Sequence, residues 1–156
     1  LERLIDDFYQ ISLLEAGQYP FYYGKVELCS LLTEILLDNY STFSVNGIEP
    51  QIEIPDVNIY LNADRKACIR IIQNLIFNAI TSTTSNVVVQ LIYNTDSVQL
   101  CIKNPIATIP TEEYSKLLER FYVADISRSN GTSGQGLYIV KKLLFVHYKG
   151  GDRKWI

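Results

Sequence analysis

The sequence predicts an α+β fold, a two-layer sandwich in which helices pack on one face of a mixed β-sheet. Apolar residues recur at the helical period of about 3.6 residues in several segments and alternate strictly in several others. The two kinds of segment are interspersed along the chain, as expected when helices cover a sheet. The chain has 156 residues, 47% of them hydrophobic and 20% charged, which is enough for one domain with its own core.

The first predicted helix covers residues 1–16, and Gly17 and Pro20 end it. One side of this helix is apolar along most of its length. The apolar pattern is already present at the first residue. We therefore expect residues 1–18 to be the end of a longer helix and residues 19–156 to form a separate domain. The predicted apolar side consists of Leu1, Leu4, Ile5, Phe8 and Ile11, followed by Ser12 and Glu15.

The remaining elements follow in chain order. A second helix is predicted at 27–39, and the turn signal Asn46-Gly47 marks residues 40–50 as a loop. The longest helix starts at Asp64 and runs to about residue 81, and the last helix runs from Gly136 to about residue 147. Residues 104–133 form a long loop, and loops of this length are usually functional. The predicted strands are 22–26, 51–54, 58–61, 87–93 and 98–103, and a short helical piece is predicted at 111–121.

Composition narrows the class of function. The net charge is −3 and the pI about 5.1, so we expect no nucleic-acid partner. No apolar run approaches the roughly 20 residues of a membrane span. The three cysteines are far apart and form no CxxC pair, which argues against a zinc site or a disulfide framework.

Two asparagines, Asn74 and Asn78, lie one turn apart on one face of the longest predicted helix. The surrounding residues are strongly apolar, and buried amides need hydrogen-bond partners. One interpretation is a satisfied pair of core amides. The other is a cluster of oxygen ligands for magnesium and phosphate, since magnesium prefers hard oxygens. The sequence leaves both interpretations open.

A glycine-rich segment, residues 131–137 (GTSGQGL), leads into the last predicted helix. Glycines allow a close approach of the backbone, and the free N–H groups at a helix start favour phosphate. The segment does not match the P-loop pattern, because no lysine follows. Arg128 either faces phosphate or is a solvated loop side chain. For His147, the only histidine, we expect local packing or a dipole contact instead of catalysis.

In this order and spacing, the segments resemble the histidine kinase ATPase domain of the GHKL superfamily, the Bergerat fold. The resemblance covers nearly the whole chain and implies a protein histidine kinase that uses ATP and Mg²⁺. Its parts are the end of the dimerisation and histidine-phosphotransfer hairpin (12–17, SLLEAG), the N box (Asp64-Arg65 with 74–79, NLIFNA), the F box (119–122, ERFY), the second glycine box (134–142, GQGLYIVKK) and the end of the following helix (147–151, HYKGG).

The resemblance implies a role for each matching residue. Asn78 would bind magnesium between the phosphates, and Asn74 would lie by the terminal phosphate or its water. Gly134 and Gly136 would let the backbone approach the phosphates, and Asn104 would accept a hydrogen bond from the adenine amino group. Residues 105–133 would form a lid over ATP. The other residues expected to contact the nucleotide are Ile109, Tyr122, Arg128, Gln135 and Leu137.

The chain departs from the family pattern at three places. The usual DxGxG box is replaced by residues 104–110 (NPIATIP), where Asn104 keeps an acceptor but loses the charge. This altered box resembles that of kinases that sense antibiotics or peptides in Gram-positive bacteria. Thr81 stands where the family often has a lysine, so one phosphate-facing cation is lost. The family usually also continues into a final strand hairpin, whereas this sequence stops at Ile156.

We therefore expect the domain to transfer the γ-phosphate of Mg-ATP to a histidine on an upstream helical hairpin of the same protein. By itself, the chain is expected to bind ATP without labelling itself. The further expected partner is a response regulator. The full-length protein is expected to be a homodimeric, membrane-anchored kinase with this domain in the cytoplasm.

Two other classes of function compete with this expectation. One is a degenerate nucleotide-binding or scaffold domain without phosphotransfer activity. The other is a hydrolysing ATPase related to gyrase or to the heat-shock chaperone of the superfamily. Those relatives use a glutamate base where this chain has Asn74. A carboxylate activates water better than an amide, which disfavours steady hydrolysis.

Overall fold

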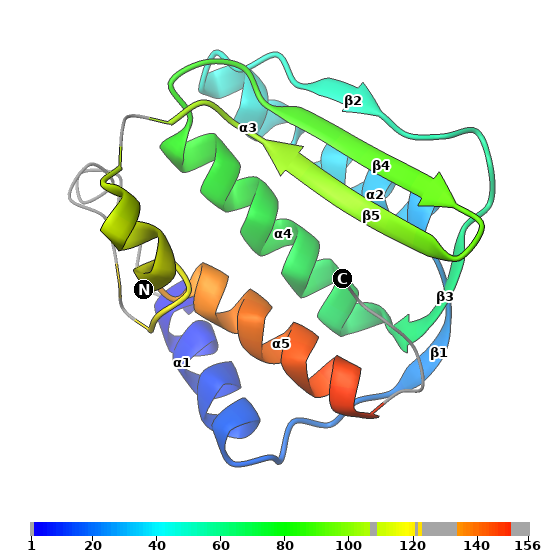
Figure 1. The fold of residues 1–156 in the computed structure, drawn as a ribbon, viewed down its shortest axis with the longest axis vertical. Helices are drawn as coiled ribbons and strands as arrows, with labels where there is room; N and C mark the ends of the chain where they lie inside the picture. Colours follow the sequence, from blue (N-terminus) through cyan, green and yellow to red (C-terminus); the bar gives the residue numbers. More distant parts are fainter. Residues whose placement is uncertain (1, 107–108, 121, 123–133, 151–156) are drawn as a thin grey trace.

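The computed structural model describes residues 2–106, 109–120, 122 and 134–150, with side chains up to residue 144 (Figure 1). No helix in these ranges is long and apolar enough to cross a membrane. The elements are α1 (Glu2–Glu15), β1 (Tyr23–Glu27), α2 (Leu28–Asp38), α3 (Tyr40–Val45), β2 (Gln51–Glu53), β3 (Tyr60–Asp64), α4 (Arg65–Ser82), β4 (Val88–Asn94), β5 (Ser97–Lys103), the 3₁₀ helix η1 (Thr111–Lys116) and α5 (Gly136–Gly150).

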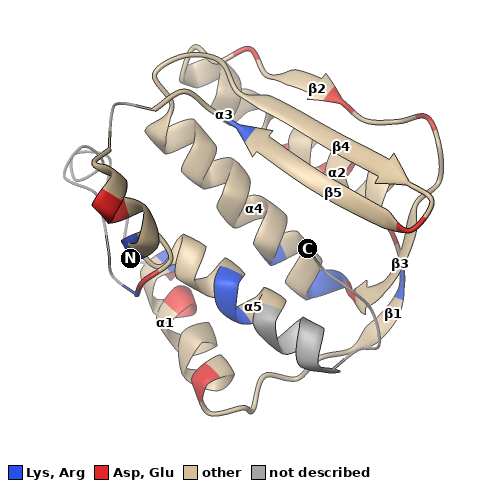
Figure 2. Ribbon diagram, in the orientation of Figure 1, with Lys and Arg blue, Asp and Glu red and all other residues tan. Residues whose placement is uncertain are grey.

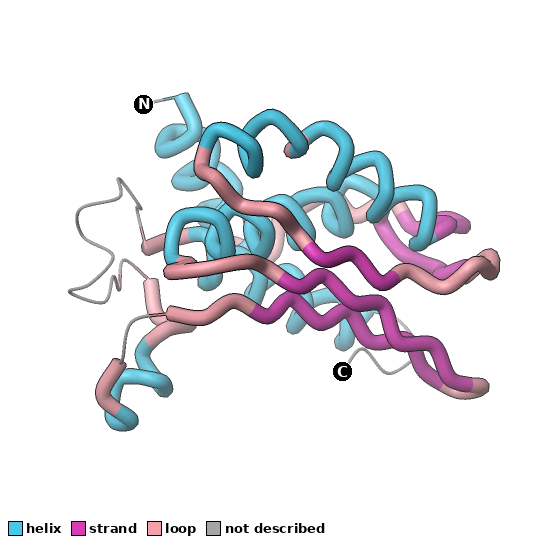
Figure 3. Tube along the Cα trace, turned by 90° about the horizontal axis from the view of Figure 1, so that it is seen from above, coloured by secondary structure: helices cyan, strands magenta, loops and turns pink. Residues whose placement is uncertain are grey.

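The strands form a three-stranded mixed sheet and a separate two-stranded ladder. In the sheet, β4 lies in the centre, parallel to β2 and antiparallel to β5. The ladder is the antiparallel pair of β1 and β3. Figure 3 shows the strands of the larger sheet gathered on one side of the molecule and most of the helices on the other. This arrangement confirms the predicted α+β sandwich with a mixed sheet.

Helix α4 lies between two apolar clusters. The larger cluster joins α2 to α4 and to the inward-facing residues of β4, among them Leu32, Ile76 and Val89, all fully buried. The smaller cluster joins α1 and α5 to the start of α4 through Ile11 and Leu143. Helix α5 therefore lies alongside both α1 and α4, as Figure 1 shows.

The start of α4 and the β4–β5 hairpin follow the sequence prediction closely. Asp64 caps α4, because its carboxylate accepts a hydrogen bond from the N–H of Ala67 at 2.8 Å. The same carboxylate accepts the N–H of Tyr22 at 2.6 Å, which ties the chain before β1 to the start of α4. In the hairpin Asn94 pairs with Ser97, so the strands turn at the predicted place.

The apolar side of α1 only partly coincides with the side that the domain buries. The structure buries Asp7, Ile11 and Leu14, whereas Leu4, Ile5 and Phe8 of the predicted apolar side are exposed. Ile11 and Leu14 pack into the smaller apolar cluster, and an ion pair adds to this contact. Asp7 forms an ion pair with Arg70 of α4, and this pair turns a mixed polar and apolar side of α1 toward the domain.

The prediction of a loop at residues 40–50 was wrong, because residues 40–45 form the short helix α3. Ser, Thr and Asn in this stretch weigh against a helix. Tertiary packing overrides that preference, since Phe43 is only 1% exposed and belongs to the larger core. The predicted Asn46-Gly47 turn ends α3, and Gly47 has the positive φ of 67° that favours glycine.

Glu27 gives α2 a pH-dependent cap. Its carboxylate accepts hydrogen bonds from the Ser30 side chain and from the N–H groups of Ser30, Ile59 and Cys29, which lower its pKa to about 2 from an ordinary 4.5. The ionised form is thus favoured by folding. Its stabilisation is complete above pH 4.5 and is lost as the pH falls from 4.5 toward 2.

We expect Glu27→Gln to lower stability at pH 7 and to flatten the loss of stability below pH 4.5, because the variant has no carboxylate to protonate. Urea unfolding between pH 2.5 and 7 measures both effects. Glu49→Gln, at an exposed position, is the control for the loss of one negative charge. Parallel profiles for wild type and Glu27→Gln would show that this cap does not set the acid sensitivity.

Candidate functional site

The N-terminal end of α5 packs directly against α4. A Cβ atom built on Gly136 would lie 3.3 Å from Oδ1 of Asn74, which is closer than nearly all real Cβ contacts. Gly134 has a φ of 67°, so the turn into α5 needs a glycine there as well. Asn74 and the glycine-rich helix start, 62 positions apart in sequence, therefore share one site.

The first turn of α5 presents its backbone to this site. The carbonyl of Gln135 accepts the N–H of Ile139 at 2.9 Å, so Gln135 is the residue from which the helix starts. The N–H groups of Gly136 and Leu137 then belong to the first turn, where a helix offers donors and the positive end of its dipole. This is the backbone arrangement that binds phosphate.

Two buried polar atoms, one on Asn74 and one at the start of α5, lack hydrogen-bond partners among the described residues. Asn74 is 2% exposed and Gln135 is 1% exposed. Neither Nδ2 of Asn74 nor Oε1 of Gln135 has a hydrogen-bond partner in the described part of the chain. Buried polar groups are nearly always satisfied. These two atoms therefore argue against a self-contained pair of core amides and favour a site that is completed by a ligand.

Asn78 lies one turn further along α4 and is partly exposed. The backbone carbonyl of Asn78 accepts a hydrogen bond from the Ser82 hydroxyl at 2.5 Å. The Ser82 hydroxyl oxygen in turn accepts a hydrogen bond from Nδ2 of Asn104 at 3.1 Å. Because Ser82 donates its hydroxyl proton to Asn78, it can only accept from Asn104, whose amide nitrogen therefore points toward Ser82. Oδ1 of Asn104 accepts no hydrogen bond from any described residue and remains available as an acceptor.

The chain after β5 is fastened to the end of α4. The carbonyl of Pro105 accepts the N–H of Thr84 at 2.8 Å. Ile109, further along, is 9% exposed. Tyr122 donates its hydroxyl to Glu113 beside η1. The structure thus brings Asn104 to the Asn78 end of α4, whereas Arg128 lies outside the described residues.

Sequence reasoning missed the contribution of α1. Arg3 donates a hydrogen bond from Nη2 to Oδ1 of Asn74 at 3.2 Å, and its Cζ lies 3.7 Å from the ring centroid of Phe77. Burial raises the pKa of the neighbouring Asp7, while the cations of Arg70 and Arg3 oppose this effect. No local signal in the sequence announces the contact of Arg3, because its partner lies 71 residues away.

The match to a family model agrees with this geometry. The model of the histidine kinase-, DNA gyrase B- and HSP90-like ATPases (HATPase_c) matches residues 63–154, which include all of α4 and the start of α5. The chain belongs to this family. This HATPase domain is an ATP-binding catalytic domain, and the resemblance that we inferred from its boxes is confirmed.

Curated relatives of the HATPase domain are sensor kinases. It is 27% identical over 147 residues to the sensor histidine kinase YcbM of Bacillus subtilis. This alignment covers 92% of the chain and 47% of YcbM. It is 29% identical over 156 residues to the sensor protein VanSC of Enterococcus gallinarum, covering 97% of the chain and 42% of that protein. The chain thus spans less than half the length of these two relatives.

Solved structures show the same fold at low sequence identity. The histidine kinase AdeS of Acinetobacter baumannii gives a TM-score of 0.73 at 19% identity, covering 92% of this chain and 66% of that one. The nucleotide-free catalytic domain of histidine kinase ThkA gives 0.72 at 21% identity, covering 81% and 82%. The fold of the domain is therefore established independently of the sequence motifs on which the resemblance was based.

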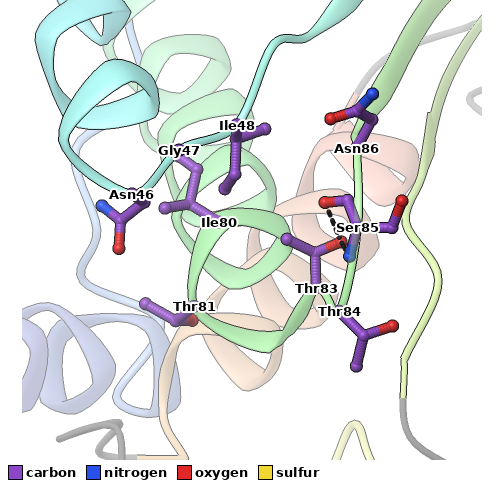
Figure 4. A pocket seen from close by; sticks show the side chains of 9 residues that line it. All are labelled: Asn46, Gly47, Ile48, Ile80, Thr81, Thr83, Thr84, Ser85 and Asn86. Atoms are coloured by element: carbon purple, nitrogen blue, oxygen red, sulfur yellow. Dashed lines mark hydrogen bonds between the residues drawn. The ribbon is translucent and has the colours of Figure 1, made fainter.

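The HATPase domain also has a polar pocket of about 470 Å³ at the C-terminal end of α4. Figure 4 shows it between the α3–β2 turn at Asn46 and the start of β4 near Asn86, with Thr81 on its wall. Sequence reasoning did not predict this pocket. None of the residues that we assigned to the nucleotide lines it, so it is distinct from the site between α4 and α5.

We expect Gly136→Ala to weaken ATP binding of the HATPase domain about tenfold, equivalent to ~1.4 kcal/mol. The added methyl group would meet Oδ1 of Asn74 at 3.3 Å and push the first turn of α5 away from α4. Calorimetric titration with Mg-ATP measures the loss. Gly24→Ala is the matched control, because a Cβ there meets nothing within 4 Å. If Gly136→Ala bound Mg-ATP with wild-type affinity, the phosphates would not lie at the start of α5.

Proposed function

We propose that this chain is the ATP-binding catalytic domain of a two-component sensor histidine kinase. One observation carries the proposal: Asn74 of α4 packs against Gly136, so the predicted metal-binding helix and the predicted phosphate loop share one site. Family membership supports the use of ATP. The relatives named as sensor histidine kinases favour a kinase over the other branches of the family.

The residues present fit a magnesium-bound triphosphate. In the proposed complex the side-chain oxygen of Asn78 binds the metal, and Asn74 faces the terminal phosphate with the amide nitrogen that lacks a partner among described residues. The N–H groups at Gly136 and Leu137 hold phosphate oxygens. Bound magnesium supplies neutralisation of the charge on the phosphates.

The adenine end of the nucleotide is assigned to Asn104, beyond Asn78 at the C-terminal end of α4. Oδ1 of Asn104 accepts the adenine amino group, in an orientation supported by its bond to Ser82. The buried side chain of Ile109 provides apolar contact for the base. Tyr122 and Arg128 remain predictions for the lid, Tyr122 as a packing residue and Arg128 as a phosphate contact.

The proposed reaction is a direct transfer. A nitrogen of the acceptor histidine attacks the γ-phosphorus, the bond from phosphorus to the β,γ-bridging oxygen breaks, and ADP leaves. The imidazole proton passes to solvent. Phosphoryl transfer of this kind depends mainly on positioning and on charge stabilisation. The amide of Asn74 cannot accept a proton from water as a carboxylate does, which favours transfer over hydrolysis.

The proposed partners follow from the same assignment. Residues 1–18 are the end of a helical hairpin whose upstream part carries the acceptor histidine, and residues 19–156 are the catalytic domain. From that histidine the phosphate passes to an aspartate of a response regulator. We place the domain in the cytoplasm, as part of a homodimeric, membrane-anchored kinase.

Two changes in the sequence favour a second candidate, a degenerate nucleotide-binding or scaffold domain without transfer activity. Asn104 provides a neutral acceptor in place of a charged one, and Thr81 removes a cation. Calorimetry with ATP, with and without Mg²⁺, separates the two candidates. Micromolar to low-millimolar binding that needs Mg²⁺ supports the kinase, and no binding at millimolar ATP supports the scaffold.

A further inference from the structure

We propose that Arg3 of α1 contacts the terminal phosphate of bound ATP and supplies the positive charge that α4 lacks. This inference rests on the proposed nucleotide site. Nη2 of Arg3 lies 3.2 Å from Oδ1 of Asn74, the residue that also packs against the first turn of α5. Arg3 and Gly136 therefore approach the same side chain from α1 and from α5.

The charge distribution on α4 leaves a place for such a cation. Its basic residues are Arg65, Lys66 and Arg70, all before the site. Figure 2 shows the blue parts of α4 toward its N-terminal end. Asn74 and Asn78 at the site are neutral. A bound magnesium ion compensates only part of the charge of a triphosphate, and arginine is well suited to the remaining phosphate oxygens.

The guanidinium of Arg3 is held in place yet has donors to spare. It lies flat enough on Phe77 for its Cζ to be 3.7 Å from the ring centroid, a cation–π contact. A guanidinium has five N–H donors. Within the described ranges only the bond to Asn74 is made, and Arg3 is exposed to solvent. A phosphate at Asn74 can therefore accept hydrogen bonds from the same group without breaking its existing contact.

The position of Arg3 depends on how α1 is docked. Asp7, one turn after Arg3, forms its ion pair with Arg70. At the other end of α1, Glu15 accepts hydrogen bonds from Arg120 at 3.2 Å and from Tyr138 of α5 at 2.9 Å. Helix α1 is thus fixed at both ends to the catalytic core. A movement of α1 would therefore change the position of Arg3 at the phosphate site.

The test compares nucleotides that differ only in their phosphates. Mg-ATP, Mg-ADP and AMP are titrated calorimetrically into wild type, Arg3→Ala, Arg3→Lys and Lys25→Ala. We expect Arg3→Ala to weaken ATP binding about tenfold or more, as for a charged hydrogen bond, and to leave AMP binding unchanged. Arg3→Lys, which keeps the charge without the fork, should lie between. Lys25 stacks on Tyr60 away from the site and is the matched control.

Each other outcome is decisive. Equal weakening for all three nucleotides would show that Arg3 only supports the fold, and tighter ATP binding in Arg3→Ala would show that it blocks the site. Either result overturns the inference and leaves the proposed function standing. Failure of wild type to bind ATP overturns both. Thermal unfolding checks that Arg3→Ala is folded, and Arg3→Lys decides the question if it is not.

Discussion

Asn78→Ala is expected to reduce phosphoryl transfer to the upstream helical domain on the order of 100-fold or more, because the metal loses its side-chain oxygen and the phosphates lose alignment. Asn78 is the partly exposed amide of α4, and no described residue occupies its side-chain oxygen. Transfer is measured as labelling of the separately prepared upstream domain, which carries the acceptor histidine, by radioactive ATP. Calorimetric titration of Asn78→Ala with ATP should show binding that no longer depends on Mg²⁺.

The fold should tolerate this change well. Alanine is a better helix former than asparagine, and the hydrogen bond from Ser82 goes to the backbone carbonyl of residue 78, which the substitution keeps. Loss of labelling can therefore be attributed to the site once unfolding curves match.

Asn86→Ala is the control, since this exposed amide lines the separate polar pocket. We expect it to label the upstream domain as wild type does. Full labelling by Asn78→Ala, or its loss in Asn86→Ala, would move the metal away from α4 and contradict the proposed site.

Sequence periodicity predicted the parts of the fold that depend on local residue patterns. Helix α4 starts at the predicted cap Asp64 and ends within one residue of the predicted end. The β4–β5 hairpin turns where expected. These elements were predictable because each has its apolar period, its cap or its turn within a few neighbouring residues.

The errors and omissions have a common physical origin in contacts between distant segments. The buried face of α1 combines Ile11 and Leu14, which pack into the smaller apolar cluster, with Asp7, which pairs with Arg70, 63 residues away. The contact of Arg3 with Asn74 and that of Asn104 with Ser82 are likewise long-range. Single-sequence patterns contain no information on which of many polar residues will meet across helices.

The candidate site was predictable in its components and not in its completeness. The family resemblance, read from the order of the sequence motifs, implied that Asn74 and Gly136 share one site. The structure places these two residues in contact. The unpartnered amide atoms of Asn74 and Gln135, within the described residues, emerge only from three-dimensional packing. They favour a ligand site over a pair of satisfied core amides, the two interpretations that the sequence left open.

Phe43→Ala is expected to destabilise the domain by about 3–5 kcal/mol, the range for removing a fully buried aromatic side chain. Phe43 is 1% exposed and is the largest of the fully buried side chains. Its helix has only six residues and begins without a side-chain cap hydrogen bond. A helix this short is not stable by itself. The insertion of Phe43 into the core is therefore what keeps residues 40–45 helical.

Urea unfolding measures the loss, with Tyr40→Ala as the matched control in the same helix. Tyr40 is 69% exposed, so its truncation should change stability by no more than about 0.5 kcal/mol. Similar losses in the two variants would mean that helical propensity, and not burial, holds α3. A large loss confined to Phe43→Ala would show why composition alone predicted a loop here: one anchoring side chain decides the conformation of the whole stretch.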